Sequence, residues 1–299
     1  MSDALAGSPI VVGVDGSHAA IQAAQWAAAE AAHRSAPLLL VHVVTVPASS
    51  YTGGLGLTTG YYEGLEEQGR KFLTETKAQL ADAFPGLDVR TALDTGDPVG
   101  TLVEHSRGAR LLVLGSRGLG GVTGILAGST AVGMVAYGHC PVAVVRGRTE
   151  HQQPPASGPV VVGVDGTRAS DTAVELAFEE ASIRGAQLVA VHTWVEFSSD
   201  SAYAYARQFV RDWSEVEEHE KELLATGLAG WQQKYPDVPV RRVVVRDRPV
   251  RQLLAHAADA QLMVVGSRGH GGFAGMLLGS TSQALIYHAP CPLLVVRGR

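Results

Sequence analysis

The feature that most constrains the fold is an internal repeat that covers most of the chain. Residues 9–44 align without a gap with residues 159–194, and residues 109–148 align without a gap with residues 260–299. A chain of 299 residues is long enough for two domains of about 150 residues, each with a core of its own. The repeat therefore predicts two domains with the same fold.

The stretch between the two copies is predicted to be a linker. Residues 149–158, with the sequence TEHQQPPASG, are polar and include Pro154 and Pro155, so they offer few side chains to a core. This prediction places the first domain at residues 1–148 and the second at residues 159–299.

Within each copy, short apolar runs alternate with stretches of helical pattern. The runs are apolar throughout, as expected for strands that helices cover on both faces. We therefore expect an α/β fold in which each domain is a doubly wound, five-stranded parallel sheet. Ser17 is expected to cap the first helix, and Asp97 is expected to cap the third, ahead of Pro98. In the first copy the strands are expected at residues 10–14, 38–46, 90–93, 111–114 and 142–145, and the helices at 19–33, 62–84, 99–107 and 129–137.

Charge and composition exclude several classes of protein. The formal net charge of −5 gives no basic field for a phosphate backbone, so nucleic acid is not an expected partner. No stretch approaches the roughly 20 apolar residues of a membrane helix and no signal sequence is evident, so we expect a cytoplasmic protein without membrane contact. The two cysteines, Cys140 and Cys291, are too few for a disulfide framework and are expected to be buried thiols.

A glycine-rich segment follows the fourth strand in each copy. Nine residues separate Gly115-Ser-Arg-Gly118 from Gly128-Ser129-Thr130, and nine separate Gly266-Ser-Arg-Gly269 from Gly279-Ser280-Thr281. Glycine lets the backbone take a positive φ and approach a ligand closely, so such a loop can aim several N–H groups at one anion. The helix start that follows, with unpaired N–H groups and two hydroxyls, favours phosphate.

Asp15 and Asp165 follow the first strands of the two copies. In an open parallel sheet, ligands bind outside the carboxyl ends of the strands where the strand order reverses. With the order 3-2-1-4-5, the aspartate and the glycine loop would face each other across one crevice. A nucleotide fits this geometry, with the aspartate near the base or ribose, the phosphates on the loop, and a magnesium ion on the phosphates.

A tight turn is the alternative interpretation of a glycine loop between a strand and a helix, and one copy alone would not decide between the two. The copies have diverged over residues 49–99 and 198–250, yet both retain the aspartate, the spaced glycines and the Gly-Ser-Thr triplet. This retention favours the nucleotide site, although shared packing needs explain part of it.

The motifs VVGVDGS, G-x2-G-x9-G-[ST] and CPVAVV resemble the universal stress protein family in its tandem-domain form, over nearly the whole chain. The resemblance implies adenine nucleotide alpha hydrolase-like domains with strand order 3-2-1-4-5, paired through their last strands and each binding ATP or a related adenine nucleotide. At the nucleoside end of the two sites it implies Gly13, Asp15 and the main chain of Val41, with Gly163, Asp165 and Val191 in the second copy. For ribose and phosphates it implies Gly115, Ser116, Arg117, Gly118, Leu119, Gly120, Gly121, Gly128, Ser129 and Thr130, with Gly266, Ser267, Arg268, Gly269, His270, Gly271, Gly272, Gly279, Ser280 and Thr281.

Other residues that could carry chemistry have weaker patterns. His42 and His192 occupy matching places in the second strands, where a hydrogen-bonded core or rim histidine is favoured over a metal ligand. No metal site is predicted, because the remaining histidines lack an HExxH or similar spacing. Neither a GxSxG motif nor a Walker lysine is present. Arg117 and Arg268 fit phosphate contact and solvent exposure equally well.

The segments after the second strands differ between the copies. Residues 47–60 fit a mobile lid and a disordered insert equally well. The second copy has Trp194, Tyr203, Tyr205 and Trp213 around its insert, which indicates different packing there, and its acidic residues 215–222 are expected on the solvated side of a long helix.

The sequence is compatible with two functions from different classes. The preferred hypothesis is a regulatory module in which ATP occupancy orders the loops and changes how the surface engages a protein partner or another copy of the chain. The alternative is an enzyme of the same fold class, either a slow ATPase or an adenylyl-transferring enzyme. The sequence offers no convincing base or electrophile for that chemistry.

Overall fold

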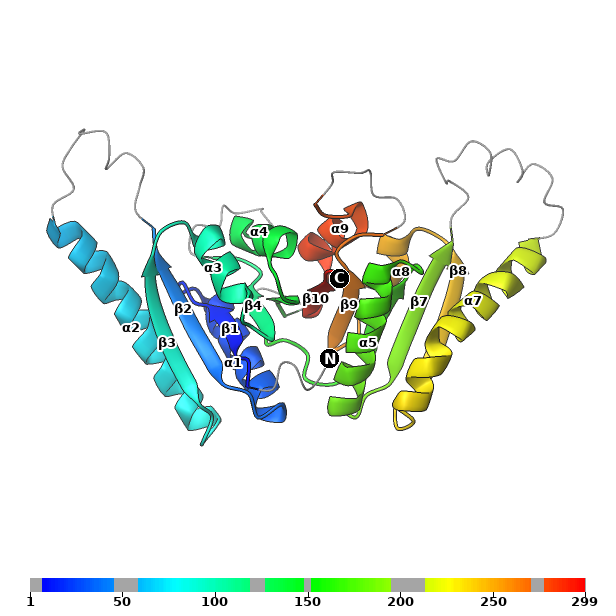
Figure 1. Ribbon diagram of the computed structural model, residues 1–299, viewed down its shortest axis with the longest axis horizontal. Helices are drawn as coiled ribbons and strands as arrows, with labels where there is room; N and C mark the ends of the chain where they lie inside the picture. Colours follow the sequence, from blue (N-terminus) through cyan, green and yellow to red (C-terminus); the bar gives the residue numbers. More distant parts are fainter. Residues whose placement is uncertain are drawn as a thin grey trace. The chain divides into compact units, whose positions relative to one another are not determined.

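The computed structural model describes residues 7–45, 59–118, 127–147, 152–194, 213–269 and 277–298 (Figure 1). Its contacts divide the chain into two compact units, Met1–Pro154 and Pro155–Arg299. The division falls within the polar stretch 149–158.

The first unit alternates strands and helices. Its elements are β1 Ile10–Gly13, α1 His18–His33, β2 Leu38–Val44, α2 Thr59–Ala83, β3 Val89–Thr95, α3 Pro98–Ser106, β4 Leu111–Gly115, α4 Ser129–Tyr137 and β5 Val142–Val145. The strands are parallel and ordered β3-β2-β1-β4-β5, which confirms the predicted order 3-2-1-4-5. Helix α1 packs against α2, and α3 packs against α4, so the two faces of the sheet are covered by different helix pairs.

The second unit repeats this arrangement. Its elements are β6 Val160–Val164, α5 Arg168–Ile183, β7 Leu188–Trp194, α7 Trp213–Lys234, β8 Val240–Arg246, α8 Pro249–Ala257, β9 Leu262–Gly266, α9 Ser280–His288 and β10 Leu293–Val296. The parallel order β8-β7-β6-β9-β10 is the same 3-2-1-4-5 order. The doubly wound α/β fold is therefore confirmed in both units.

The central strands form the core of each unit. In the first unit Ile10 of β1 pairs in register with Leu38 of β2 and Leu111 of β4, and Ile10 and Leu38 have no exposed surface. The edge strand β3 is longer than the predicted strand at residues 90–93. The prediction left out Val89 and the polar residues Asp94 and Thr95, which an edge strand tolerates because it has less of its surface to bury.

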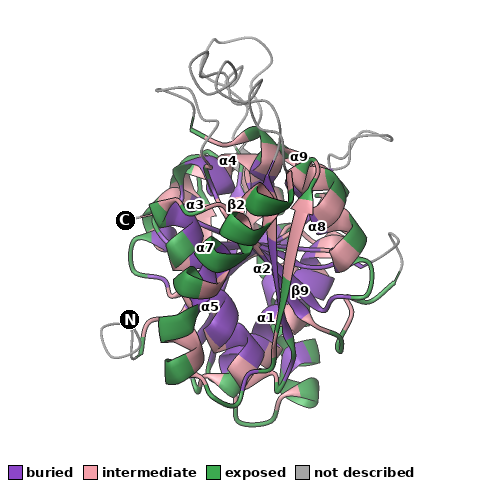
Figure 2. Cartoon of the chain, turned by 90° about the vertical axis from the view of Figure 1, so that its right-hand side faces the viewer, coloured by how far each residue is buried: buried purple, intermediate pink, exposed green. Residues whose placement is uncertain are grey.

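The helices begin at the predicted caps. The Ser17 hydroxyl accepts a hydrogen bond of 3.2 Å from the Ala20 N–H at the start of α1, and the Asp97 carboxylate accepts one of 2.7 Å from the Gly100 N–H at the start of α3. On α7 the outward side is coloured as exposed (Figure 2), and Glu215, Glu218 and Glu222 are exposed as expected, whereas Glu220 is half-buried.

Both cysteines are buried, which confirms the interpretation as core thiols. Burial raises the pKa of the Cys140 thiol to about 12, so the reactive thiolate form is suppressed at neutral pH. Among the described helices, none combines the length and the hydropathy needed to cross a bilayer.

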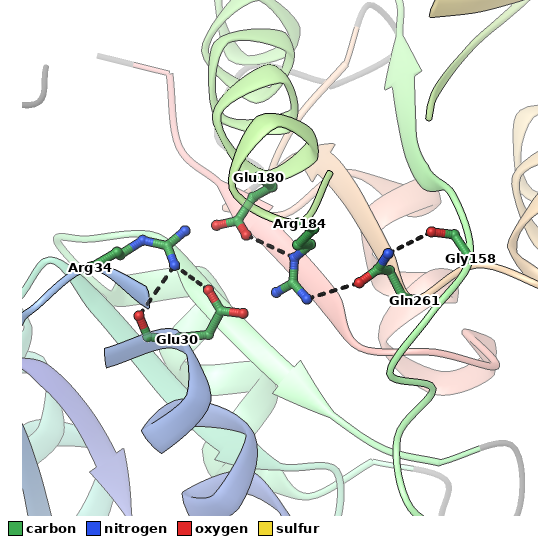
Figure 3. A network of polar contacts seen from close by, with 6 residues as sticks. All are labelled: Glu30, Arg34, Gly158, Glu180, Arg184 and Gln261. Carbon is green, nitrogen blue, oxygen red and sulfur yellow. Dashed lines mark hydrogen bonds and ion pairs between the residues drawn. The ribbon is translucent and has the colours of Figure 1, made fainter. Parts of the chain in front are cut away.

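The polar stretch between the units is anchored rather than free along its described residues. In the first unit, the carbonyl of Gln152 accepts a hydrogen bond of 3.1 Å from the buried side-chain amide of Gln22. In the second unit, the side-chain amide of Gln261 donates to the Gly158 carbonyl (Figure 3). The polar composition of residues 149–158 therefore correctly indicated few side chains for a core. It did not indicate that the main chain of this stretch accepts hydrogen bonds from the folded units.

Candidate functional site

The first component of the candidate site is the aspartate after the first strand of each unit. The turn that follows β1 takes Gly16 through a φ of +87°, and Asp15 Oδ1 accepts a hydrogen bond of 3.0 Å from the Ser17 N–H. The carboxylate is therefore held at the start of α1, where the helix dipole favours negative charge. In the second unit Asp165 Oδ1 accepts hydrogen bonds from the N–H of Thr167 at 3.0 Å and from its hydroxyl at 2.7 Å.

The Ser17 hydroxyl supports this turn, because it caps α1 and also lies 3.5 Å from the Arg117 carbonyl oxygen of the glycine segment. We expect Ser17→Ala to lower the free energy of unfolding by about 1 kcal/mol, the usual cost of a lost N-cap, as measured by urea denaturation. Ser17→Thr is the matched control, because Thr167 caps α5 with its hydroxyl in the second unit. An equal loss in both variants would contradict the capping argument.

The second component is the glycine-rich segment after the fourth strand, of which both ends are described. The Ser116 N–H donates a hydrogen bond of 3.0 Å to the Val145 carbonyl of β5, and the Ser116 carbonyl accepts one of 2.8 Å from the Gly128 N–H. A main-chain hydrogen bond thus holds the start of α4 next to the end of β4. The corresponding hydrogen bonds of the second unit run from Ser267 to Val296 at 2.7 Å and from Gly279 to Ser267 at 2.8 Å.

The carboxylate and the glycine segment lie side by side in both units. A Cβ atom added to Gly118 would overlap the Oδ2 atom of Asp15, and one added to Gly269 would overlap Oδ2 of Asp165. Gly128 lies over the same segment, since a Cβ atom there would be 3.9 Å from the Gly118 nitrogen. The structure therefore brings together the residues that the strand order predicted to face each other.

Close approach, rather than an unusual backbone conformation, explains the glycines of this segment. Gly115, Gly118 and Gly128 all have φ outside the left-handed region, so a positive φ is not what requires glycine at these positions. At Gly118 the space that a side chain would need is filled by the Asp15 carboxylate.

Other predicted site glycines have a packing role of their own. A Cβ atom on Gly13 would lie 2.5 Å from Leu114 Cδ2, and one on Gly115 would lie 2.7 Å from the carbonyl carbon of Ala19 in α1. Contact between these glycines and a nucleotide stays a prediction. Their counterparts in the second unit are Gly163, which faces Leu253 and Val265, and Gly266, which faces Ala169.

The helices that follow the glycine segments begin without a side-chain cap. Their N-cap residues are Gly128 and Gly279, neither of which has a side chain to accept a hydrogen bond from the first turn. The uncapped N–H groups and the positive end of the helix dipole favour an anion at each position. At these helix starts Ser129 and Ser280 are exposed, whereas Thr130 and Thr281 are half-buried.

The main chain of Val41 is part of the sheet. Its carbonyl accepts a hydrogen bond of 2.8 Å from the Val14 N–H, and Val41 pairs in register with Gly13, the last residue of β1. Val43, whose main chain faces the same side, lies past the end of β1 and is a further candidate for main-chain contact with a ligand, which was not predicted from the sequence. The sequence signal for Val43 is the length of the second apolar run, which predicts a strand that extends past the end of the first strand. Val191 and Thr193 are the matching residues of the second unit.

The second-strand histidines are hydrogen-bonded residues at the rim of the sheet, which confirms their interpretation. His42 Nδ1 donates to the Val14 carbonyl at 2.6 Å, and His192 Nδ1 donates to the Val164 carbonyl at 2.8 Å. His192 Nε2 also lies 2.9 Å from the Glu220 carboxylate on α7. Glu220 therefore differs from its acidic neighbours, because it faces the sheet rather than solvent.

The remaining predicted residues are less informative. Arg117 is half-buried, whereas Arg268 is exposed. Within the described ranges, no three His, Cys, Asp or Glu side chains gather as metal ligands. Outside the described residues lie Leu119, Gly120, Gly121, His270, Gly271, Gly272, Tyr203, Tyr205 and most of residues 47–60.

Comparisons with known proteins agree with the duplicated fold. The family model described as "Universal stress protein family" matches twice, at residues 8–146 and 157–297. A universal stress protein of Mycobacterium tuberculosis is 42% identical over 96% of this chain and 96% of the relative, and one of Mycolicibacterium smegmatis is 40% identical over 97% of each. The crystal structure of a universal stress protein from Archaeoglobus fulgidus shares the fold, with a TM-score of 0.69 and 22% identity over 97% of this chain and 96% of the other.

Proposed function

This chain belongs to the universal stress protein family, and on that premise we propose that it is a regulatory protein that binds ATP in each of its two units. The observation that carries the proposal is the placement of a carboxylate against a glycine segment that leads into an uncapped helix start. The arrangement occurs twice, at Asp15 with Gly118 and at Asp165 with Gly269.

Each part of the site has a distinct role in the proposal. The carboxylate accepts hydrogen bonds from donors at the nucleoside end, and the glycine segment approaches the phosphates closely because it has no side chains in the way. The N–H groups at the start of α4, with Ser129 and Thr130, bind phosphate oxygens. Magnesium lies on the phosphates and takes few protein ligands.

ATP occupancy then acts as a signal. Binding favours one arrangement of the loops around the nucleotide and so changes the surface offered to a protein partner or to another copy of the chain. We place this activity in the cytoplasm. Each site belongs to one domain, residues 1–148 or 159–299, with residues 149–158 as the linker.

Binding of two ATP molecules is the direct test of this function. Equilibrium dialysis with ATP and magnesium should show two ATP per chain, and native mass spectrometry should show adenine nucleotide in the protein as purified. ATP at 100 times its dissociation constant should raise the free energy of unfolding by about 2.7 kcal/mol per site. A crystal grown with ample ATP and magnesium but without nucleotide at either aspartate would refute the proposal.

Turnover measurements separate a regulatory protein from an enzyme. We expect hydrolysis slower than roughly 0.1 per second, far below the typical enzyme value of about 10 per second. A faster rate that Gly118→Val and Gly269→Val together remove would assign an ATPase to these sites.

A further inference from the structure

Two tryptophans and an arginine form a cluster at the carboxyl ends of β7 and β8. Trp194, the last residue of β7, pairs in register with Arg246, the last residue of β8. The ring of Trp213, at the start of α7, stacks on Trp194 with centroids 5.9 Å apart, and the Arg246 guanidinium carbon lies 4.0 Å from the Trp213 centroid. In the first unit the matching register pair is Val44 with Thr95, which forms no such cluster.

The indole N–H of Trp194 is a buried donor without an acceptor. Trp194 is 6% exposed, and its Nε1 atom has no hydrogen-bond partner, the one such buried side-chain atom in the described ranges. Buried donors are nearly always paired, so this donor calls for a partner that arrives from outside the fold. A hydrogen bond made in such an enclosed place is strong, because water does not compete for the donor.

The strand order places Trp194 on the nucleoside side of the proposed second site. Val164, directly before Asp165, pairs with His192, so Trp194 lies level with the turn that follows Asp165. The glycine segment and α9 follow β9, on the opposite side of β6. Neighbouring strands are about 4.8 Å apart, so β9 and β7 are separated by about 10 Å. A nucleotide with its phosphates at α9 would therefore extend its base towards β7.

We propose that Trp194 is a specificity-determining residue of the second nucleotide site, where its indole N–H donates to a ring nitrogen or carbonyl oxygen of the base. Trp213 and Arg246 hold the indole ring in place by stacking. This inference rests on the proposed function. Because Val44 offers no side-chain donor at the matching position, the two sites recognise the base differently.

The first test follows the indole N–H directly. The chain contains four tryptophans, so a proton–nitrogen spectrum of the full chain has four indole signals, each assigned with a Trp→Phe variant. ATP with magnesium should move the Trp194 signal downfield and slow its exchange with solvent. The signal of Trp231, which lies on α7 beside Lys234, is the control and should not move.

The second test measures affinity at the second site alone. In a Gly118→Val background, Trp194→Phe should weaken ATP binding about 3- to 10-fold, the effect of one lost hydrogen bond, whereas Trp231→Phe should change it less than about twofold. If ATP binds but the Trp194 signal stays in place, the inference is wrong and the proposed function stands. If ATP binds to neither unit, both are wrong. Should Trp194→Phe fail to fold, the spectrum of the unaltered chain decides.

Discussion

Replacing Gly118 with valine should abolish ATP binding to the first unit. The first atom of the new side chain would overlap Asp15 Oδ2, so either the carboxylate or the glycine segment must move. Because Gly118 has no positive φ, valine adds no backbone strain, and the fold should remain intact. We expect affinity at this site to fall about 100-fold or more, equivalent to the loss of two hydrogen bonds to charged groups. Equilibrium dialysis should then show one ATP per chain instead of two.

The second unit allows the same experiment to be repeated, and a glycine outside the site provides a control. Gly269→Val should remove the second ATP in the same way, and the double variant should bind none, because Gly269 faces Asp165 as Gly118 faces Asp15. Gly108→Val is the matched control, since a Cβ atom there would meet no atom within 4 Å. Full occupancy in the double variant would mean that the phosphates lie elsewhere.

The repeated elements were the part of the fold that the sequence predicted best. Buried parallel strands are apolar throughout, so the order of strands and helices followed from the apolar runs and the duplicated motifs. The edge strand β3 was predicted too short, because its last residues, Asp94 and Thr95, are polar and did not extend the apolar run. Strand order then sufficed to place Asp15 against Gly118, although these residues are far apart in the sequence.

The contacts that distinguish the two units were not predictable in the same way. Sequence placed His42 and His192 at equivalent positions, but it did not show that Glu220 reaches His192, since an acidic run on a helix normally faces solvent. The sequence marked Trp194 and Trp213 as a sign of different packing, but it did not show that they stack on each other, because they lie on different elements. Such contacts depend on where two diverged segments meet in space, and no local pattern encodes that.

The roles of individual glycines also needed the structure. From the sequence, Gly115 and Gly118 had the same explanation, a loop that approaches a phosphate. In the structure Gly115 is required by the backbone of α1 at Ala19, whereas Gly118 is required by the Asp15 carboxylate. Of the two, Gly118 is therefore the sharper probe of the site, since substitution of Gly115 would disturb the packing of the sheet as well.

A second large effect is expected at a buried ion pair far from the glycine segments in sequence. The Arg184 Nε atom donates a hydrogen bond of 3.2 Å to the Glu180 carboxylate, and these side chains are 9% and 2% exposed. Arg184 also donates to Gln261, which holds the Gly158 carbonyl (Figure 3). Glu180→Ala removes the carboxylate and leaves a buried guanidinium, so we expect a loss of about 3 kcal/mol in the free energy of unfolding, measured by urea denaturation.

Two comparisons show whether burial is the cause of that loss. Glu217→Ala removes another i,i+4 partner in the same unit, but Glu217 and Lys221 are 47% and 46% exposed, so the change should leave the free energy of unfolding almost unchanged. The double variant Glu180→Met with Arg184→Met should recover part of the stability that Glu180→Ala loses, because an apolar pair avoids the cost of burying two charges but also gives up the hydrogen bond from Arg184 to Gln261. If Glu180→Ala lowers the free energy of unfolding no more than Glu217→Ala does, other contacts of the Arg184 guanidinium are sufficient without this carboxylate. The ion pair would then contribute little to the stability of the second unit.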